Sequence, residues 1–136
     1  MHALAVPEDH LPIYRLEAEL LKLPQVEMPT EHDHCDGVYA RTMHLVAGHA
    51  YTGAVHRHEC FFVVRSGSLV ATSDDGPRQL VAGDMLVTRA GSKRAVVALT
   101  DCVVTTFHAN PINERSPAAL WDLLVTPAPA LELEGA

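Results

Sequence analysis

Two histidines and a cysteine alternate in the stretch GAVHRHECFFVVRSG, residues 53–67, where His56, His58 and Cys60 occupy every second position. Side chains alternate between the two faces of a β-strand, so these three groups would share one face, which we expect to point inward. Imidazoles two positions apart on a strand lie about 6.5–7 Å apart at the backbone and can converge on one ion together with ligands from neighbouring strands. The alternation therefore predicts a metal site, with Cys60 either as a ligand or as a small buried apolar residue.

The donor types narrow the choice of metal. Neutral imidazole and thiolate suit zinc, iron, nickel or copper, whereas magnesium and calcium prefer oxygen ligands. A site with three protein ligands would leave a coordination position open for water or substrate, as in catalytic metal sites. The sequence thus predicts a divalent transition metal as cofactor and leaves its identity open.

Further histidines could complete such a site. His108 ends the stretch CVVTTFH, and alternation places it on the same face as Cys102, Val104 and Thr106. We expect it as the third ligand, entering from a different strand; the alternative is a histidine at a strand end on the rim. His34, in EHDHCD, is a further candidate if that polar segment folds over the barrel mouth, and otherwise belongs to an exposed lead-in.

Two arginines are candidate substrate-binding residues. Arg94 belongs to the basic stretch TRAGSKRAV and Arg41 to GVYAR, and a guanidinium suits a carboxylate or a phosphate. The alternative is a solvated surface position for each. Glu59 would face away from the ligands on a regular strand, where an ion pair is the plainer role, so no catalytic residue is assigned.

The elements that must position these residues follow from periodicity and turn signals. Apolar spacing between two prolines predicts a short helix over residues 12–23, and residues 24–37 read as an extended polar lead-in. Ser116 can cap a second helix, in SPAALWDLLV, and Pro117 can occupy its first position. We expect the tail after this helix to be loose or packed on a neighbouring subunit. Between these ends, turns every 8–12 residues predict an all-β sandwich or barrel built from the runs at residues 38–46, 54–64, 68–73, 78–82, 85–89, 93–99 and 102–108.

Composition limits the class of protein. A chain of 136 residues fits one domain, which we divide into residues 1–37, a barrel at 38–110, and a C-terminal helix and tail at 111–136. A net charge of −7 argues against nucleic acid and anionic membranes as partners. No signal peptide or membrane span is evident, and three cysteines without a CxxC pair indicate reduced thiols, so we expect a cytoplasmic protein. Hydrolase, P-loop and dinucleotide fingerprints are absent.

The histidine stretch, together with GDMLVTRAGSKR from Gly83, resembles the two sequence motifs of the cupin superfamily. The resemblance spans residues 38–108 and implies a double-stranded β-helix, or jelly-roll barrel, with His56 and His58 as metal ligands. Segments such as GVYARTMHLVAG and TTFHAN are most similar to short cupin-like proteins of uncharacterised function, some of them phage-associated, in which a histidine at the position of His108 ends the last strand.

Two of the family's four usual ligands are replaced. Cys60 stands where the first motif has a glutamate, and Arg94 stands where the second has a histidine, so that Arg94 could hold an anionic substrate beside the metal. One hypothesis is a metal-dependent enzyme acting on a small anionic polar metabolite by isomerisation, lyase chemistry or oxygenation. The other is a non-catalytic cupin that binds a ligand or serves as a structural or regulatory module without metal. Cupins often pair, so a homodimer is expected.

Overall fold

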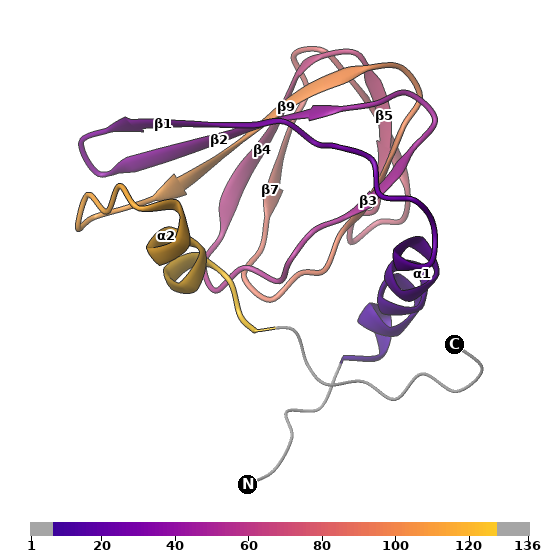
Figure 1. Ribbon diagram of the computed structural model, residues 1–136, viewed down its shortest axis with the longest axis horizontal. Coiled ribbons are helices and arrows are strands. Elements are labelled where there is room, and N and C mark those ends of the chain that lie inside the picture. Colours follow the sequence, from indigo (N-terminus) through magenta and orange to yellow (C-terminus); the bar gives the residue numbers. More distant parts are fainter. Residues whose placement is uncertain (1–6, 128–136) are drawn as a thin grey trace, which may run out of the picture.

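The structure, a computed structural model, describes residues 7–127 and consists of two packed β-sheets with a helix near each end (Figure 1). The helical elements are a single 3₁₀ turn at Glu8–His10, α1 at Leu11–Leu21 and α2 at Pro117–Leu124. The strands in chain order are β1 (Thr30–Cys35), β2 (Val38–Leu45), β3 (Ala50–Thr52), β4 (Cys60–Ser66), β5 (Ser68–Ala71), β6 (Arg78–Val81), β7 (Met85–Thr88), β8 (Ala95–Ala98) and β9 (Cys102–Ala109).

All strand pairs are antiparallel, in one sheet of order β1-β2-β9-β4-β7 and a second of order β3-β8-β5-β6. Alternate residues of both sheets point inward and form one apolar core. Val64 from the first sheet and Leu69 and Ala98 from the second have no exposed surface. This two-sheet, antiparallel jelly-roll architecture confirms the predicted all-β fold class.

The chain crosses from the first sheet to the second at Gly67, between β4 and β5. Gly67 has φ +87°, and a Cβ there would collide with the Asp101 carbonyl oxygen and with Cys102 Sγ. Only glycine combines that backbone conformation with so close an approach. The RSG signal therefore marks one of the places where the chain passes from one sheet to the other.

The predicted helices are present, with small shifts in their ends. The first was expected at residues 12–23 and is found at Leu11–Leu21. The second begins as expected, with Pro117 at its first position and Ser116 Oγ accepting a hydrogen bond from the Ala119 N–H at 3.4 Å. Most of the tail predicted to be loose or packed on a neighbour lies outside the described residues.

Two strands fall in segments expected to lack them. The lead-in at residues 24–37 contains β1, which pairs with β2 along its whole length, and the turn expected at residues 47–53 contains β3, paired with β8. Neither segment has the apolar alternation of a half-buried strand, because β1 is an edge strand with mostly exposed side chains and β3 is only three residues long. Sheet pairing rather than hydrophobic pattern defines both.

The strand predicted over residues 54–64 is wrong in its first half, because β4 begins at Cys60. The backbone before it bonds to the end of α2 instead of to a sheet partner. The Arg57 N–H donates to the Leu124 carbonyl at 2.8 Å, the Thr126 N–H donates to the Val55 carbonyl at 2.9 Å, and His56 forms an isolated bridge with Val125. His56 and Cys60 therefore do not lie on one regular strand.

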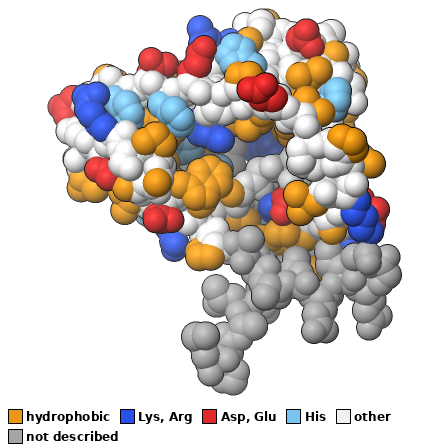
Figure 2. Space-filling model, in the orientation of Figure 1, with side chains coloured by type: hydrophobic (Ala, Val, Ile, Leu, Met, Phe, Trp, Pro, Cys, Tyr) orange, Lys and Arg blue, Asp and Glu red, His pale blue; other side chains and the backbone are white. Residues whose placement is uncertain are grey.

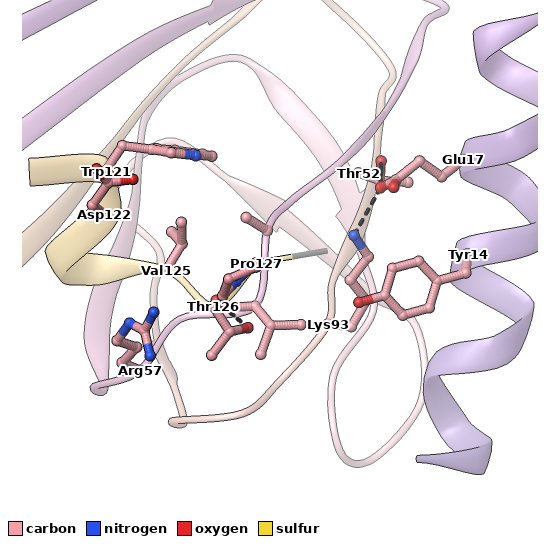
Figure 3. A pocket seen from close by; sticks show the side chains of 12 residues that line it. Tyr14, Glu17, Thr52, Arg57, Lys93, Trp121, Asp122, Val125, Thr126 and Pro127 are labelled. Carbon is pink, nitrogen blue, oxygen red and sulfur yellow. Dashed lines mark hydrogen bonds and ion pairs between the residues drawn. The ribbon is translucent and has the colours of Figure 1, made fainter. Parts of the chain in front are cut away.

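The two helices lie along the lower side of the barrel in Figure 1, with α2 near the ends of β2 and β9 and α1 near β3. The α1 helix is held by the buried Lys93 Nζ, which lies 2.7 Å from Glu17 Oε2 and 4.4 Å from the centre of the Tyr14 ring (Figure 3). The α2 helix packs Leu120 and Leu124 against Tyr39 of β2. Within residues 7–127, neither helix has the length and apolar character needed to span a bilayer.

Candidate metal centre and adjoining cavity

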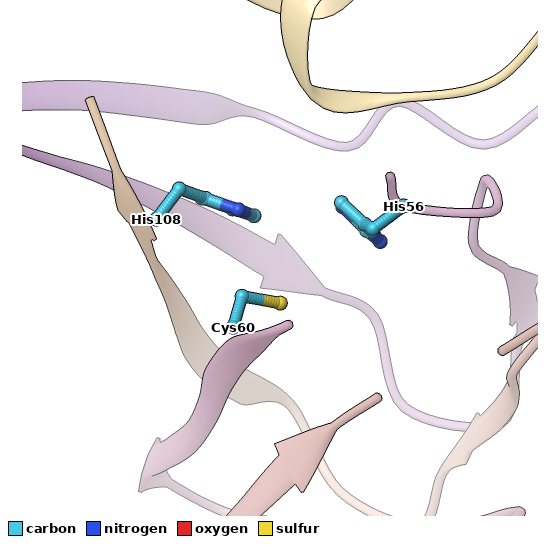
Figure 4. A group of neighbouring side chains, drawn as sticks. All are labelled: His56, Cys60 and His108. Atoms are coloured by element: carbon cyan, nitrogen blue, oxygen red, sulfur yellow. The ribbon is translucent and has the colours of Figure 1, made fainter. Parts of the chain in front are cut away.

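Three ligand-type side chains converge at the mouth of the barrel. One nitrogen each from His56 and His108 and the sulfur of Cys60 all lie within 4.8 Å of one another. Figure 4 shows them reaching a common space from three directions: His108 from β9, Cys60 from the start of β4, and His56 from the loop before it. Cys60 and His108 are buried, and His56 is partly buried. A histidine, cysteine, histidine group of this kind can hold a metal ion.

Sheet register places two of the three groups. Cys60 lies opposite Thr88 of β7, and His108 lies opposite Tyr39 of β2, so both side chains face the barrel interior. His56 is placed by its backbone, whose carbonyl accepts a hydrogen bond from the Gly91 N–H at 2.9 Å. The site therefore depends on contacts among four separate segments of the chain.

Both imidazoles are poised in the neutral form that binds metals. Burial, then the nearby charges of His56 and Arg41, lower the pKa of His108 to about 4. Burial also lowers the pKa of His56, reinforced by Arg41 and Arg94. At neutral pH each ring thus presents a lone pair rather than a second proton.

The hydrogen bonds of the two imidazoles differ. One nitrogen of His108, Nε2, lies 2.8 Å from the Thr106 hydroxyl, which leaves the other nitrogen available. The Nδ1 atom of His56 is buried and has no hydrogen-bond partner among residues 7–127. Buried polar atoms are nearly always paired. A buried imidazole nitrogen without a partner, in a residue grouped with a thiol and a second imidazole, is therefore consistent with a metal ligand.

Of the three side chains, Cys60 is the one whose metal-binding form, the thiolate, is disfavoured by burial. Burial raises the pKa of its thiol, while a hydrogen bond from Thr88 and the charge of Arg94 act in the opposite direction. The Thr88 hydroxyl also accepts a hydrogen bond from Arg94 Nη2 at 3.0 Å, so that it links the guanidinium to the sulfur. A bound cation would supply the remaining drive toward the thiolate.

The residues present therefore fit a transition metal. Two neutral imidazoles and one thiolate are the donors that zinc, iron, nickel and copper accept. The positive charges of Arg41 and Arg94 lie close enough to affect the histidine pKa values, so the thiolate is needed to offset the charge of the cation. The same charges favour an anion as a further ligand.

Two hollows meet at the three ligand-type residues. A cavity of about 240 Å³ lies inside the barrel, and a second of about 330 Å³ lies between β1, β2 and α2. His56, Arg41 and Trp121 line both of them. Figure 2 shows this hollowed face with Lys or Arg side chains, in blue, set back inside the opening.

Two of the predicted ligands lie elsewhere. His58 is exposed and outside the group, because the chain bends before β4 and the expected alternation does not start until Cys60. His34 lies opposite Tyr39 in the sheet register, and Tyr39 lies opposite His108, so a whole strand separates His34 from the group. The rings of His34, Tyr39 and His108 stack in that order, with centroid distances of 5.3 and 5.7 Å.

Three residues at the site went unassigned in the sequence: Thr88, Thr106 and Trp121. The two threonines face inward on strands that the pattern predicted, so alternation alone could have placed them beside Cys60 and His108. Trp121 lines the cavities from α2, although 45% of it is exposed. Its contact with Arg41 depends on how α2 docks, which no local signal encodes.

Comparison with known proteins identifies the fold. No family model matches the sequence, and no curated protein matches it. Among solved structures, a cupin superfamily protein from Desulfitobacterium hafniense is 17% identical with a TM-score of 0.54, covering 80% of this chain and 98% of that one. The cupin domain of an XRE family transcriptional regulator from Enterobacter cloacae is 16% identical with a TM-score of 0.53, covering 62% and 97%.

A salicylate 1,2-dioxygenase from Pseudaminobacter salicylatoxidans is a further structural neighbour, 16% identical with a TM-score of 0.59. The alignment covers 85% of this chain and 35% of the dioxygenase, so the chain spans about a third of that enzyme's length. At these identities the likeness concerns the fold. The chain has a cupin-like fold, which confirms the resemblance predicted from its two motifs.

Proposed function

We propose that this protein is a metal-binding cupin in which His56, Cys60 and His108 hold a divalent transition metal beside a cavity for a small anionic metabolite. The observation that carries the proposal is that one ligand atom each of His56, Cys60 and His108 lie within 4.8 Å of one another, while the buried Nδ1 of His56 has no hydrogen-bond partner within residues 7–127. The lowered pKa values of both histidines add to it, since neutral rings bind cations without first losing a proton.

The arrangement suits a catalytic rather than a purely structural metal. Three protein ligands would leave a coordination position open for water or substrate, and His56 lines both cavities. When bound, the metal would polarise a carbonyl or lower the pKa of a bound water. The chain's own part is to bind and orient: Arg41 and Arg94 attract an anion, and the apolar wall from Phe62 and Val104 excludes water.

The reaction class stays open among isomerisation, lyase chemistry and oxygenation. The salicylate dioxygenase among the structural neighbours works on a carboxylate substrate, which agrees with the two arginines at this site. No residue is assigned here as general acid or base. Glu59 is exposed and lies outside the group of three, so it gives no support to a catalytic role.

A second candidate is a ligand-sensing module without catalysis. The likeness to a transcriptional regulator's cupin domain favours it, as do the replacements of two usual ligands by Cys60 and Arg94. In that case a ligand would bind in the cavity and the protein would have no dependence on metal. Chelator treatment would then leave ligand binding and thermal stability unchanged.

Elemental analysis tests the metal proposal directly. Protein purified without added metal and then dialysed against a zinc, iron, nickel and copper mixture should carry close to one equivalent of a transition metal. His56→Ala, Cys60→Ala and His108→Ala should each lose most of it, whereas His58→Ala, at an exposed histidine outside the group, should keep it. Equal metal content in all five proteins, or none in any, would overturn the proposal.

A further inference from the structure

We infer that Arg41 is the receptor for the carboxylate of a small, mostly apolar monocarboxylic acid, which it holds against Trp121 inside the barrel. This inference rests on the proposed function in taking the barrel cavity as a substrate site. It goes further by separating the roles of the two arginines and by naming the chemical class of the ligand.

Arg41 carries a charge that has no acidic partner within residues 7–127. A guanidinium has five N–H donors, and the one side-chain hydrogen bond found for Arg41 within residues 7–127 runs from Nη1 to the Met43 sulfur, a weak acceptor, at 3.1 Å. No Asp or Glu oxygen of that range lies within 4.0 Å of it. Partly burying a charge without a counter-charge is unfavourable, so an anionic ligand would relieve it.

Arg94 already uses two of its five N–H donors within the protein. Its Nη1 donates to the Thr72 carbonyl at 2.6 Å and its Nη2 to the Thr88 hydroxyl at 3.0 Å, while its guanidinium carbon lies 5.4 Å from the centre of the Phe62 ring. These contacts fix Arg94 as part of the wall behind Cys60. Of the two arginines, Arg41 therefore has more donors free for a ligand, because none of its side-chain donors is bonded to an oxygen within residues 7–127.

Trp121 gives Arg41 a defined orientation. The Arg41 guanidinium carbon lies 5.3 Å from the centre of the Trp121 ring, and both side chains line both cavities. Arginine stacks on aromatic faces and presents its donors along the edge of its plane, where a carboxylate can bind with two parallel hydrogen bonds. A carboxylate held there would be close to His56 and His108, whose pKa values Arg41 already influences.

The size and lining of the cavity inside the barrel restrict the rest of the ligand, beyond its carboxylate. Its volume of about 240 Å³ corresponds to roughly eight water molecules at ~30 Å³ each, which limits the ligand to a short branched chain or a single ring. Apolar side chains make up much of its wall, and a sugar or a second carboxylate placed against them would lose hydrogen bonds to water without replacement. The apolar lining residues include Met28, Met43, Leu45, Phe62, Val96 and Val104.

Isothermal titration calorimetry with benzoate and 3-methylbutanoate tests this assignment. Benzamide and 3-methylbutanamide serve as neutral isosteres, and inorganic phosphate serves as an anion without an apolar body. We expect both carboxylates to bind at least about tenfold more tightly than their amides and than phosphate, since hydrogen bonds between charged groups are lost in the amides. Trp121, the one tryptophan of the chain, should change its emission on carboxylate binding.

Three arginine variants locate the receptor. Arg41→Gln should weaken benzoate binding by about tenfold to a hundredfold, Arg94→Gln should weaken it less, and Arg57→Gln, at an exposed arginine outside this cavity, should match the wild type. Far-UV circular dichroism confirms that each variant is folded. Arg41→Lys keeps the positive charge but loses the paired guanidinium donors, so its benzoate affinity should lie between those of the wild type and Arg41→Gln.

Unchanged benzoate affinity in Arg41→Gln, or a larger loss in Arg94→Gln, would overturn the assignment. Equal binding of acids and amides would overturn it as well. The titrations are run on chelator-treated and on zinc-loaded protein, which separates this inference from the proposed function. Carboxylate binding by a protein that takes up no metal would sink the metal proposal alone, and metal uptake without carboxylate binding would sink this inference alone.

Discussion

The rings of His56 and His108 stack with 5.2 Å between their centroids and 25° between their planes. Two protonated imidazoles at this distance would repel each other, and the charge of Arg41 adds to the cost. The pair is therefore built to stay neutral, which makes the metal-free protein sensitive to acid.

Acid should destabilise the chelator-treated protein through His108. Its pKa is about 4 when folded against an ordinary value of 6.5, so between these pH values the unfolded chain binds a proton that the folded chain does not. Stability present above pH 6.5 is then lost as pH falls toward 4, by on the order of 3 kcal/mol at about 1.4 kcal/mol per pH unit. Urea unfolding at pH 7 and pH 4.5 measures it.

The comparison variant for that measurement is His108→Asn, which removes the titrating group. Its stability should fall less between pH 7 and pH 4.5 than that of the wild type. The absolute stability of the variant is irrelevant, because only the difference between the two pH values is compared. Identical pH dependence in the two proteins would show that His108 is not the group responsible.

Thr88→Val should weaken metal binding without touching a ligand. Loss of the hydroxyl removes the hydrogen bond that lowers the pKa of Cys60 and the acceptor that holds Arg94, so the thiol pKa rises further and less thiolate is available. Removing such a supporting group typically costs about 10–100-fold in metal affinity. A competition titration with a chromogenic zinc chelator at pH 7 gives the value.

Thr105→Val is the matched control for Thr88→Val. Thr105 is equally buried in the first sheet, but its hydroxyl bonds to Thr42 at 2.8 Å and lies on the other face of β9 from His108. We expect this variant to bind zinc like the wild type, whatever its stability. Equal weakening in both variants would mean that Thr88 acts only through general stability.

Glu17→Gln should loosen the attachment of α1. Lys93 has a side chain that is 4% exposed, and its charge is matched by the partly exposed Glu17, which also accepts a hydrogen bond from Thr52. Removing one partner leaves a buried ammonium unpaired, and with allowance for the exposure of Glu17 we expect a loss of about 2 kcal/mol in unfolding free energy. Urea denaturation at pH 7 provides the measurement.

The control for Glu17→Gln is Glu19→Gln on the same helix. Glu19 pairs with Lys22 at 3.0 Å, and both side chains are more than half exposed, so that pair should contribute less than about 1 kcal/mol. The double variant Glu17→Gln with Lys93→Met should recover much of the lost stability because no unpaired charge remains. Equal effects of Glu17→Gln and Glu19→Gln would contradict the special role of Lys93.

Much of the fold follows from local sequence. Turn residues at regular spacing and apolar alternation predict most strands within two or three residues, and Ser116 with Pro117 predicts the start of α2. The strands β1 and β3 do not follow, because their pairing partners rather than their own side chains make them strands. The homodimer, the cytoplasmic location and the three-part domain division stay predictions.

The site shows where local reasoning stops. Cys60 and His108 follow from alternation, because each lies within or at the start of a regular strand. His56 joins the group for another reason, because the backbone on either side of it is hydrogen-bonded to the end of α2. In this non-strand conformation His58 is exposed to solvent. These hydrogen bonds join residues 55–57 to residues 124–126, so the residues next to His56 in the sequence do not predict its position.

The position of His108 on β9 also bears on when the proposed metal site can form during synthesis. During synthesis, His56 and Cys60 leave the ribosome well before β9, and β9 must then insert between β2 and β4, which are already outside. A nascent chain that ends before residue 108 lacks the third donor and cannot form the sheet that would aim it. Under the proposed function, loading of the ion would therefore follow the synthesis of β9 and the completion of the first sheet.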